Sequence, residues 1–234
     1  MTERESATKA DNNAVTQVDP SLASVIFESE RLLVLNKNAD VSLLADRTGA
    51  PELWSHLKEN LPKPYLVHRL DKGTSGVLVV AKDQATQTTL TKSFEAHAVR
   101  KFYVARVLGH FPIKLTHRIE LPLCKGRKSR YRVAAPRETI AQVGTSFSAV
   151  ADREGVAALT YARTLSQGED YSDLCLLPIT GRTHQLRVHL SWLGYPILGD
   201  HLYGSEANRG GRLRLHCHKL YVPGVGVFHA PVPW

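Results

Sequence analysis

The chain has 234 residues, enough for one large domain or two small ones, and its 43% hydrophobic and 22% charged residues are ordinary for a globular protein. Lysine and arginine outnumber aspartate and glutamate by 30 to 22, and the resulting net charge of +8 favours a polyanionic partner, nucleic acid ahead of an anionic membrane. No apolar run reaches the ~20 residues of a membrane span, and the N-terminus lacks the apolar stretch of a secretory signal.

The N-terminal segment differs from the rest of the chain in composition. Residues 1–20 are polar, mixed in charge and poor in large apolar side chains, which predicts a disordered tail. We expect order to begin near Ser24, so a single folded domain is predicted over residues 21–234.

The remainder of the chain reads as many short strands and few helices. Strands are predicted, in chain order, at 24–27, 31–37, 76–82, 99–109, 116–122, 130–134, 140–150, 156–164, 171–179 and 214–222. Helices are predicted at 51–60, 84–98 and 183–194, with Asp83 as a cap for the second and Gly194 as the end of the third. Consecutive strands with few helices favour an α+β fold with a mixed, largely antiparallel central sheet flanked by helices and loops.

Cysteine usage indicates a reducing compartment. Cys124, Cys175 and Cys217 are odd in number and far apart, which argues against a disulfide framework and for a cytoplasmic protein. Cys217 lies between His216 and His218, but on a strand the two histidines share a face that the cysteine does not. No second group of ligands accompanies them, so we predict no metal site.

One segment is strongly cationic. Residues 125–137, KGRKSRYRVAAPR, contain no acid, and beside Tyr131 they hold Lys125, Arg127, Lys128, Arg130, Arg132 and Arg137. Six cations beside an aromatic ring are typical of a contact that follows a nucleic-acid backbone, and the alternative is a solvated hairpin. In a basic protein we favour the nucleic-acid contact, with Lys128 and Arg130 binding phosphates.

The densest polar cluster is HRLDKGTSG at residues 68–76, between apolar runs. A kinase catalytic loop would need contiguous His, Arg and Asp, and a serine hydrolase would need the pattern G-x-S-x-G around Ser75; neither is present. A third interpretation makes Asp71 the catalytic residue, because a carboxylate in a rigid turn can act as a covalent nucleophile when a cation keeps it ionised. The turn can be formed and fixed by Gly73, Thr74, Ser75 and Gly76.

This stretch resembles the signature loop H-R-L-D-x-x-T-S-G of the RluA-type family of RNA pseudouridine synthases. KFYVARVLG at 101–109 is similar to the family's K-x-Y strand, and residues 176–204 are similar to its G-R-x-H-Q-(L/I)-R-x-H block followed by G-x-P-(I/L)-x-G-D-x-x-Y-G. The resemblance covers residues 24–222, and three long motifs in the same order are more specific than any single one.

The resemblance implies a pseudouridine synthase-like fold and an isomerase that cleaves the uridine N1–C1′ bond, rotates the base and rejoins it through C5, without cofactor or metal. It implies that Asp71 is the catalytic aspartate, that Tyr103 stacks on the target base and that Arg187 pairs with the aspartate. Arg69 would fill the space left by the flipped-out uridine, and Leu186 would pack under the base. Supporting roles at the substrate are expected for His68, Thr74 and Arg182, and supporting roles behind it for Ser75, Thr183, His184 and Gln185. From Trp192, Tyr195 and Tyr203 we expect packing.

Two features depart from the family pattern. The loop NKNADVSLL at 36–44 lacks the proline and glycine of the family's N-K-P-x-G, and only 67 residues precede His68, so we expect no S4-type RNA-binding domain. The expected partner is RNA, ribosomal or transfer or both, bound by a monomer. An alternative is a catalytically idle RNA-binding or RNA-folding factor on the same scaffold, against which the intact set of Asp71, Tyr103 and Arg187 argues.

Overall fold

The computed structural model describes residues 16–46, 49, 52–128, 130–204 and 210–234. Within this part of the chain, twelve strands form one sheet and two form a small separate ribbon. The strands of the large sheet are β1 Ala23–Glu28, β2 Leu32–Lys37, β3 Tyr65–Leu66, β4 Ser75–Ala81, β5 Arg100–Leu108, β6 Thr116–Glu120, β9 Ala141–Val143, β10 Ser146–Ser148, β11 Leu159–Gln167, β12 Tyr171–Pro178, β13 Leu215–Val222 and β14 Gly226–His229. The ribbon pairs β7 Leu123–Lys125 with β8 Tyr131–Val133.

The order of strands across the sheet is β1-β2-β4-β13-β5-β12-β11-β6-β10-β9, with β3 paired to β4 and β14 to β13. Among the pairings of the described strands, β4 with β13 and β6 with β10 are parallel and the others are antiparallel. The predicted α+β fold with a mixed, largely antiparallel sheet is therefore confirmed.

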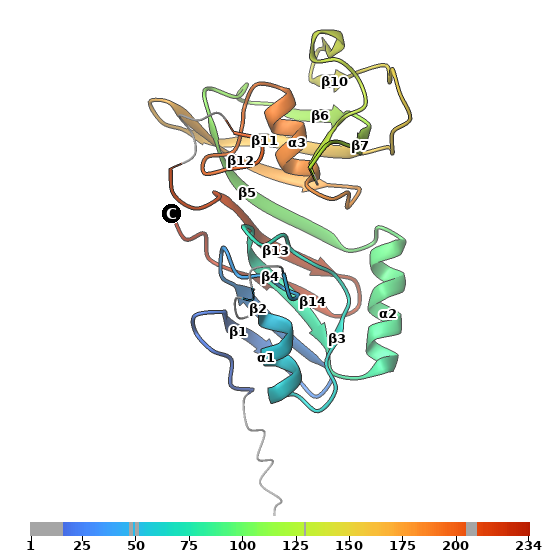
Figure 1. The fold of residues 1–234 in the computed structure, drawn as a ribbon, viewed down its shortest axis with the longest axis vertical. Coiled ribbons are helices and arrows are strands. Elements are labelled where there is room, and N and C mark those ends of the chain that lie inside the picture. Colours follow the sequence, from blue (N-terminus) through green and yellow to red (C-terminus); the bar gives the residue numbers. More distant parts are fainter. Residues whose placement is uncertain (1–15, 47–48, 50–51, 129, 205–209) are drawn as a thin grey trace, which may run out of the picture.

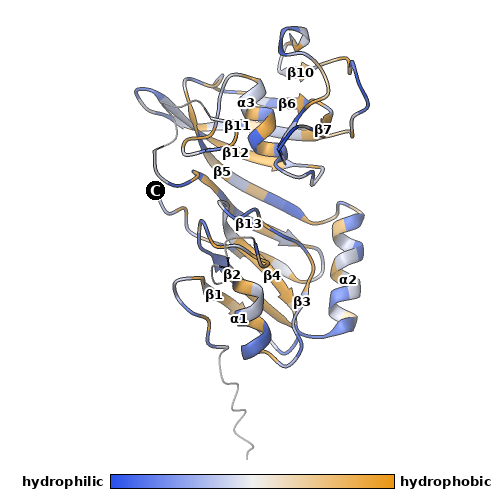
Figure 2. Cartoon of the chain, in the orientation of Figure 1, coloured by the Kyte–Doolittle hydropathy of each residue, from blue (hydrophilic) through white to orange (hydrophobic). Residues whose placement is uncertain are grey.

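The sheet joins two halves of an elongated molecule (Figure 1). Helices α1 Leu53–Asn60 and α2 Gln84–Glu95 flank the half that contains β1, β2 and β4, and α3 Gln185–Trp192 packs on β12 in the other half. Strand β4 is buried along its whole length and is coloured as hydrophobic in Figure 2, whereas α2 also shows hydrophilic residues. A strand covered on both faces reads as a continuous apolar run, which explains the sequence GVLVVA.

The helices begin and end where local chemistry dictates. The Asp83 side chain accepts a hydrogen bond from the backbone N–H of Thr86 at 2.8 Å, so the predicted cap of α2 is confirmed. This helix ends at Glu95, earlier than predicted, because the left-handed backbone of His97 (φ 52°) reverses the chain. Helix α3 begins two residues later than predicted, because His184 also has a left-handed backbone (φ 57°). Gly194 (φ 90°) follows its end as predicted.

Other expectations are corrected by the structure. The strand predicted over 140–150 is broken at Gly144 (φ 57°) into the hairpin β9–β10, and β14 was not predicted. The prediction of a disordered tail falls mostly on residues 1–15, outside the described residues. Residues 16–20 make specific contacts, since the Thr16 N–H donates to Glu28 at 2.7 Å and the Pro20 carbonyl accepts from Asn38 at 2.9 Å. Order thus begins before Ser24.

Lys37, at the end of β2, is fully buried and ties two loops to the sheet. Its ammonium donates to the carbonyl oxygens of Asn38 and Val41 at 2.8 Å and of Lys72 at 3.1 Å. The loop that lacks the family's proline and glycine is thereby fixed to the turn that contains Asp71. Burial lowers the pKa of Lys37 to about 7, although the carboxylates of Asp40 and Asp71 act in the opposite direction.

A first prediction concerns Gly76, whose φ of 114° and contact with β13 exclude a side chain. An added Cβ would lie 2.6 Å from the Cys217 nitrogen and closer still to its carbonyl oxygen. We expect Gly76→Ala to lower the free energy of unfolding by about 3 kcal/mol, measured by urea denaturation. The control is Gly194→Ala, which meets no atom within 4 Å and should cost only about 1 kcal/mol of backbone strain. Equal losses for the two variants would contradict the account.

A second prediction follows from Lys37. Its pKa is about 7 in the folded chain and about 10.4 in the unfolded chain, so between these values the unfolded chain binds more protons. Stability therefore rises with pH in this window, by about 2 kcal/mol from pH 7 to pH 9 on account of this group. Lys37→Met should remove this contribution, so the stability of the variant should rise correspondingly less between pH 7 and pH 9, whatever the substitution does to stability at pH 7. Parallel stability–pH curves for the two proteins would show that Lys37 keeps an ordinary pKa.

Candidate active site

Asp71 lies in a turn that enters β4 at the junction of the two halves of the sheet. The Thr74 N–H donates to the Asp71 carbonyl at 3.0 Å and closes the turn, and the Lys37 ammonium holds the carbonyl of Lys72. The register places Gly76 beside Cys217 on the parallel strand β13. The turn is thus held by backbone bonds, which leave the Asp71 carboxylate free to face the cavity.

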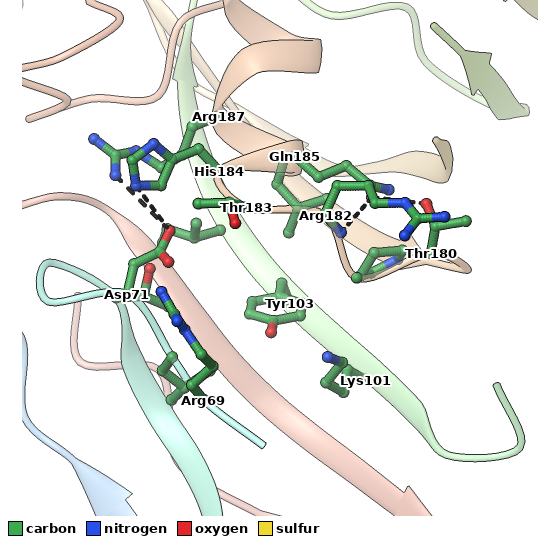
Figure 3. A pocket seen from close by; sticks show the side chains of 16 residues that line it. Arg69, Asp71, Lys101, Tyr103, Thr180, Arg182, Thr183, His184, Gln185 and Arg187 are labelled. Atoms are coloured by element: carbon green, nitrogen blue, oxygen red, sulfur yellow. Dashed lines mark hydrogen bonds and ion pairs between the residues drawn. The ribbon is translucent and has the colours of Figure 1, made fainter. Parts of the chain in front are cut away.

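A cavity of about 180 Å³ opens above this turn (Figure 3). Asp71 from the turn, Tyr103 from β5 and Arg187 from α3 line it, so three elements far apart in sequence meet there. The structure brings the predicted residues Arg69, Thr74, Arg182 and Leu186 to the same walls. Sequence reasoning left Lys101 and His184 without an assigned contact at the substrate, although both belong to the recognised motifs and both line this cavity.

Arg187 is held by a carboxylate that the sequence did not single out. Its guanidinium forms two hydrogen bonds to Asp200, at 2.8 and 2.7 Å, whereas its distance to the Asp71 carboxylate is 3.8 Å. The predicted pairing with Asp71 is therefore a facing contact, and the direct partner is Asp200. Burial disfavours the charge of Arg187, but the bonds and charge of Asp200 outweigh it and raise the pKa of Arg187. Asp200 is the acidic residue of the G-D-x-x-Y-G block, so the motif could have identified it as a site residue.

His184 faces Asp71 from the start of α3. Its Nε2 lies 3.8 Å from the Asp71 carboxylate, and its Nδ1 lies 2.8 Å from the Tyr203 hydroxyl. We expected only packing from Tyr203, but its hydroxyl also accepts the N–H of Tyr131 at 2.9 Å. Burial lowers the pKa of His184, and the charge of Asp71 only partly offsets this effect.

Tyr103 forms one wall of the cavity (Figure 3). Tyr103 is 7% exposed, and its register partner on β13 is Cys217. Burial raises the pKa of Tyr103 well above its usual value, and it raises the pKa of Cys217 to about 12. Both groups are therefore neutral at pH 7, and Tyr103 presents an uncharged aromatic ring to the cavity.

Three of the predicted substrate-binding residues lie outside this cavity. The His68 ring stacks on Phe94 with 4.8 Å between the ring centroids, and its Nε2 accepts the Val79 N–H at 2.9 Å, so His68 anchors the turn. Burial lowers the pKa of His68 to about 3. Lys128 and Arg130 are exposed at the tip of the β7–β8 hairpin. They are free to meet a partner that extends beyond the cavity.

The hairpin is nevertheless connected to the cavity. Tyr131 follows Arg130 directly, and its ring meets the ring of His184 edge-on with 5.9 Å between the centroids. The cationic tip thus lies next to the Asp71 cavity. Two further hollows, of about 560 and 330 Å³, adjoin the cavity and share Arg69 with it. Together they extend the site into a groove.

The His216 and His218 pair has structural partners. The Nδ1 of His216 lies 2.8 Å from the Ser75 hydroxyl, and its Nε2 and the Nδ1 of His218 face the Ala230 carbonyl at 3.2 and 2.7 Å. Across the described residues, no three His, Cys, Asp or Glu side chains gather in a way that could hold a metal ion. Likewise, no helix in this part of the chain is both long and apolar enough to cross a membrane.

Comparison with known proteins agrees with the geometry. Residues 31–192 match the family model described as RNA pseudouridylate synthase. Proteins named dual-specificity RNA pseudouridine synthase RluA from Vibrio vulnificus and Escherichia coli are 37% and 34% identical to the chain. These alignments cover 84% and 88% of this chain and 76% and 92% of the two relatives.

Solved structures give the same result. A structure titled Human RNA Pseudouridylate Synthase Domain Containing 1 has a TM-score of 0.73 and 26% identity, and the alignment covers 93% of this chain and 86% of that one. A second structure, titled Human RNA Pseudouridylate Synthase Domain Containing 4, has a TM-score of 0.70 and 26% identity, and the alignment covers 89% of this chain and 88% of that one. The predicted resemblance is confirmed, and the chain belongs to the RNA pseudouridylate synthase family.

Proposed function

We propose that this RNA pseudouridine synthase isomerises uridines in ribosomal RNA, transfer RNA or both, with Asp71 as the nucleophile. The observation that carries the proposal is the position of its carboxylate, which faces the cavity beside Tyr103 and Arg187. The two basic groups that face it, on Arg187 and His184, both lie at 3.8 Å, beyond hydrogen-bonding distance. The carboxylate oxygens are thus available to a substrate.

The cavity accommodates one unstacked base. A volume of about 180 Å³ admits a single pyrimidine ring, and a base must leave its stack before an enzyme can reach it. The neutral ring of Tyr103 can stack on the flipped base, which recovers roughly 1–3 kcal/mol of the unstacking cost. Arg69 is exposed at the rim, where its guanidinium can occupy the gap left in the RNA. Leu186 supplies an apolar contact under the base.

The reaction then rearranges bonds without a net change in composition. The N1–C1′ bond breaks as the Asp71 carboxylate bonds to C1′, and the uracil rotates. Its C5 then displaces the carboxylate as the C5–C1′ bond forms, after which C5 loses its proton and N1 gains one. The guanidinium of Arg187, fixed by Asp200, lies beside this carboxylate. An idle RNA-binding factor has no use for an available carboxylate in a cavity of this size, which favours the enzyme over that alternative. We also propose a cytoplasmic monomer.

A third prediction tests the role of Asp71. Asp71→Ala should abolish release of tritium from RNA labelled at uridine C5, because that proton leaves only when pseudouridine forms. RNA affinity, measured by filter binding, should change by less than about twofold, since Asp71 supplies chemistry and not phosphate contacts. Asp170→Ala, which removes an exposed carboxylate from the loop between β11 and β12, is the control and should keep the wild-type rate. Tritium release by Asp71→Ala near the wild-type rate would refute the assignment.

A fourth prediction tests the basic hairpin. The double variant Lys128→Gln/Arg130→Gln should bind RNA more weakly, and the slope of log K against log salt should become shallower by roughly 1.5, because about two phosphate contacts are lost. Lys58→Gln/Lys92→Gln removes the same charge from exposed positions of α1 and α2 and serves as the matched control. If both double variants keep the wild-type slope, the hairpin does not contact the RNA backbone.

A further inference from the structure

Four residues, Arg187, Asp200, Tyr203 and His184, form a ring with the catalytic carboxylate of Asp71. Arg187 faces Asp71 at 3.8 Å and binds Asp200 at 2.7 and 2.8 Å. Asp200 accepts the backbone N–H of Tyr203 at 3.1 Å, and the Tyr203 hydroxyl lies 2.8 Å from the Nδ1 of His184. The Nε2 of His184 returns to Asp71 at 3.8 Å. Asp71 is therefore faced by a permanent cation and by an imidazole, which lie next to each other and meet the same carboxylate oxygen (Figure 3).

The hydrogen bonds assign the proton on this imidazole. The backbone N–H of Tyr131 donates to the Tyr203 oxygen at 2.9 Å, and within the described residues the other hydrogen-bond partner of this hydroxyl is the Nδ1 of His184. With the Tyr131 N–H already on the phenol oxygen, the phenol proton is the donor toward Nδ1 in the arrangement in which Nδ1 is unprotonated. A neutral imidazole carries one proton, so that proton sits on Nε2, the nitrogen that faces Asp71.

The surroundings of His184 favour the neutral ring on which this assignment depends. Burial disfavours the imidazolium, and the charges of Arg187 and Arg69 add to this effect, while Asp71 and Asp200 oppose it; the net result is a lowered pKa of His184. The ring is also fixed in place, because it meets the rings of Tyr131 and Tyr203 edge-on at 5.9 and 5.6 Å between centroids.

The backbone adds a further constraint. His184 has a left-handed conformation (φ 57°), which is strained for residues other than glycine. The strain places the ring directly before α3, opposite Asp71. A histidine that only filled space would not require both this backbone and a hydroxyl aimed at one ring nitrogen.

We propose that His184 is a positioning residue for Asp71, held by Tyr203 in the tautomer whose Nε2–H points to one carboxylate oxygen across 3.8 Å, an electrostatic contact that leaves the other oxygen free to react with the substrate. The inference rests on the proposed function and assigns a task to His184 and Tyr203 within it. Because Tyr131 adjoins the tip of the cationic hairpin, the element expected to bind RNA phosphates also contacts the Tyr203 hydroxyl.

The tautomer can be measured without any substrate. A long-range proton–nitrogen correlation spectrum of protein labelled in its histidines, with the His184 signals identified by their loss in His184→Asn, should show the Nε2-protonated form. Tyr203→Phe removes the hydroxyl and keeps the ring, so it should give a mixture of tautomers. A wild-type spectrum with the proton on Nδ1 would overturn the proposal.

The consequence for catalysis is tested by a double-mutant cycle under single-turnover conditions. His184→Asn tolerates the left-handed backbone but does not reach Asp71, and should lower the rate constant by about tenfold with RNA affinity within about twofold of wild type. Tyr203→Phe should lower it about threefold, with no further loss in the His184→Asn background. His184→Gln, whose amide nitrogen reaches the place of Nε2, should be faster than His184→Asn and insensitive to Tyr203→Phe.

The control is Tyr221→Phe, which removes a half-exposed hydroxyl on β13 and should leave the rate unchanged. A wild-type rate for Tyr203→Phe, or losses that multiply in the double variant, would overturn the proposal while leaving Asp71 as the nucleophile. Thermal melting separates either result from a folding defect. If wild-type protein releases no tritium from any RNA, the proposed function itself fails. The spectrum still reports the tautomer of His184 in that case, because it needs no substrate.

Discussion

The site depends on the bidentate bond between Arg187 and Asp200. Asp200 is 1% exposed, and besides the guanidinium it accepts the backbone N–H groups of Leu202 and Tyr203 at 2.9 and 3.1 Å. One carboxylate thus fixes the cation that faces Asp71 and the turn that presents the Tyr203 hydroxyl. Loss of one partner of such a buried pair leaves an uncompensated charge, at a cost of about 3–5 kcal/mol. The arrangement of the polar ring around Asp71 follows from this interaction.

The second constraint is the close approach of β4 and β13, which only glycine permits at position 76. It brings the Asp71 turn beside the strand pair β13–β5, from which Tyr103 projects. Lys37 fixes the same turn from behind through the Lys72 carbonyl, a task that requires its ammonium to be buried. Preorganisation of this kind lets a carboxylate and an aromatic ring meet a flipped base without rearrangement of the backbone.

Much of this site could be predicted from sequence because its motifs are local and resemble those of a known family. The turn around Asp71, the strand that carries Tyr103 and the helix that carries Arg187 each appear within about ten residues. Asp200 and Tyr203 gain their contacts only in the folded chain, so the sequence indicated the ion pair of Arg187 with Asp71 and missed its hydrogen bonds to Asp200. His68 packs on Phe94 and lines the two adjoining hollows, not the Asp71 cavity, which its motif alone could not indicate. The late start of α3 was missed because a left-handed histidine has no signal in hydrophobic spacing.

The central claim is that this groove modifies uridines in RNA. Its most direct test is a map of pseudouridines in total RNA from cells that lack the gene, after incubation with the purified protein and, in parallel, with Asp71→Ala protein. The account predicts new pseudouridines at defined positions with the wild-type protein alone, and those positions would identify the RNA class. No new site with either protein, or the same sites with both, would contradict it.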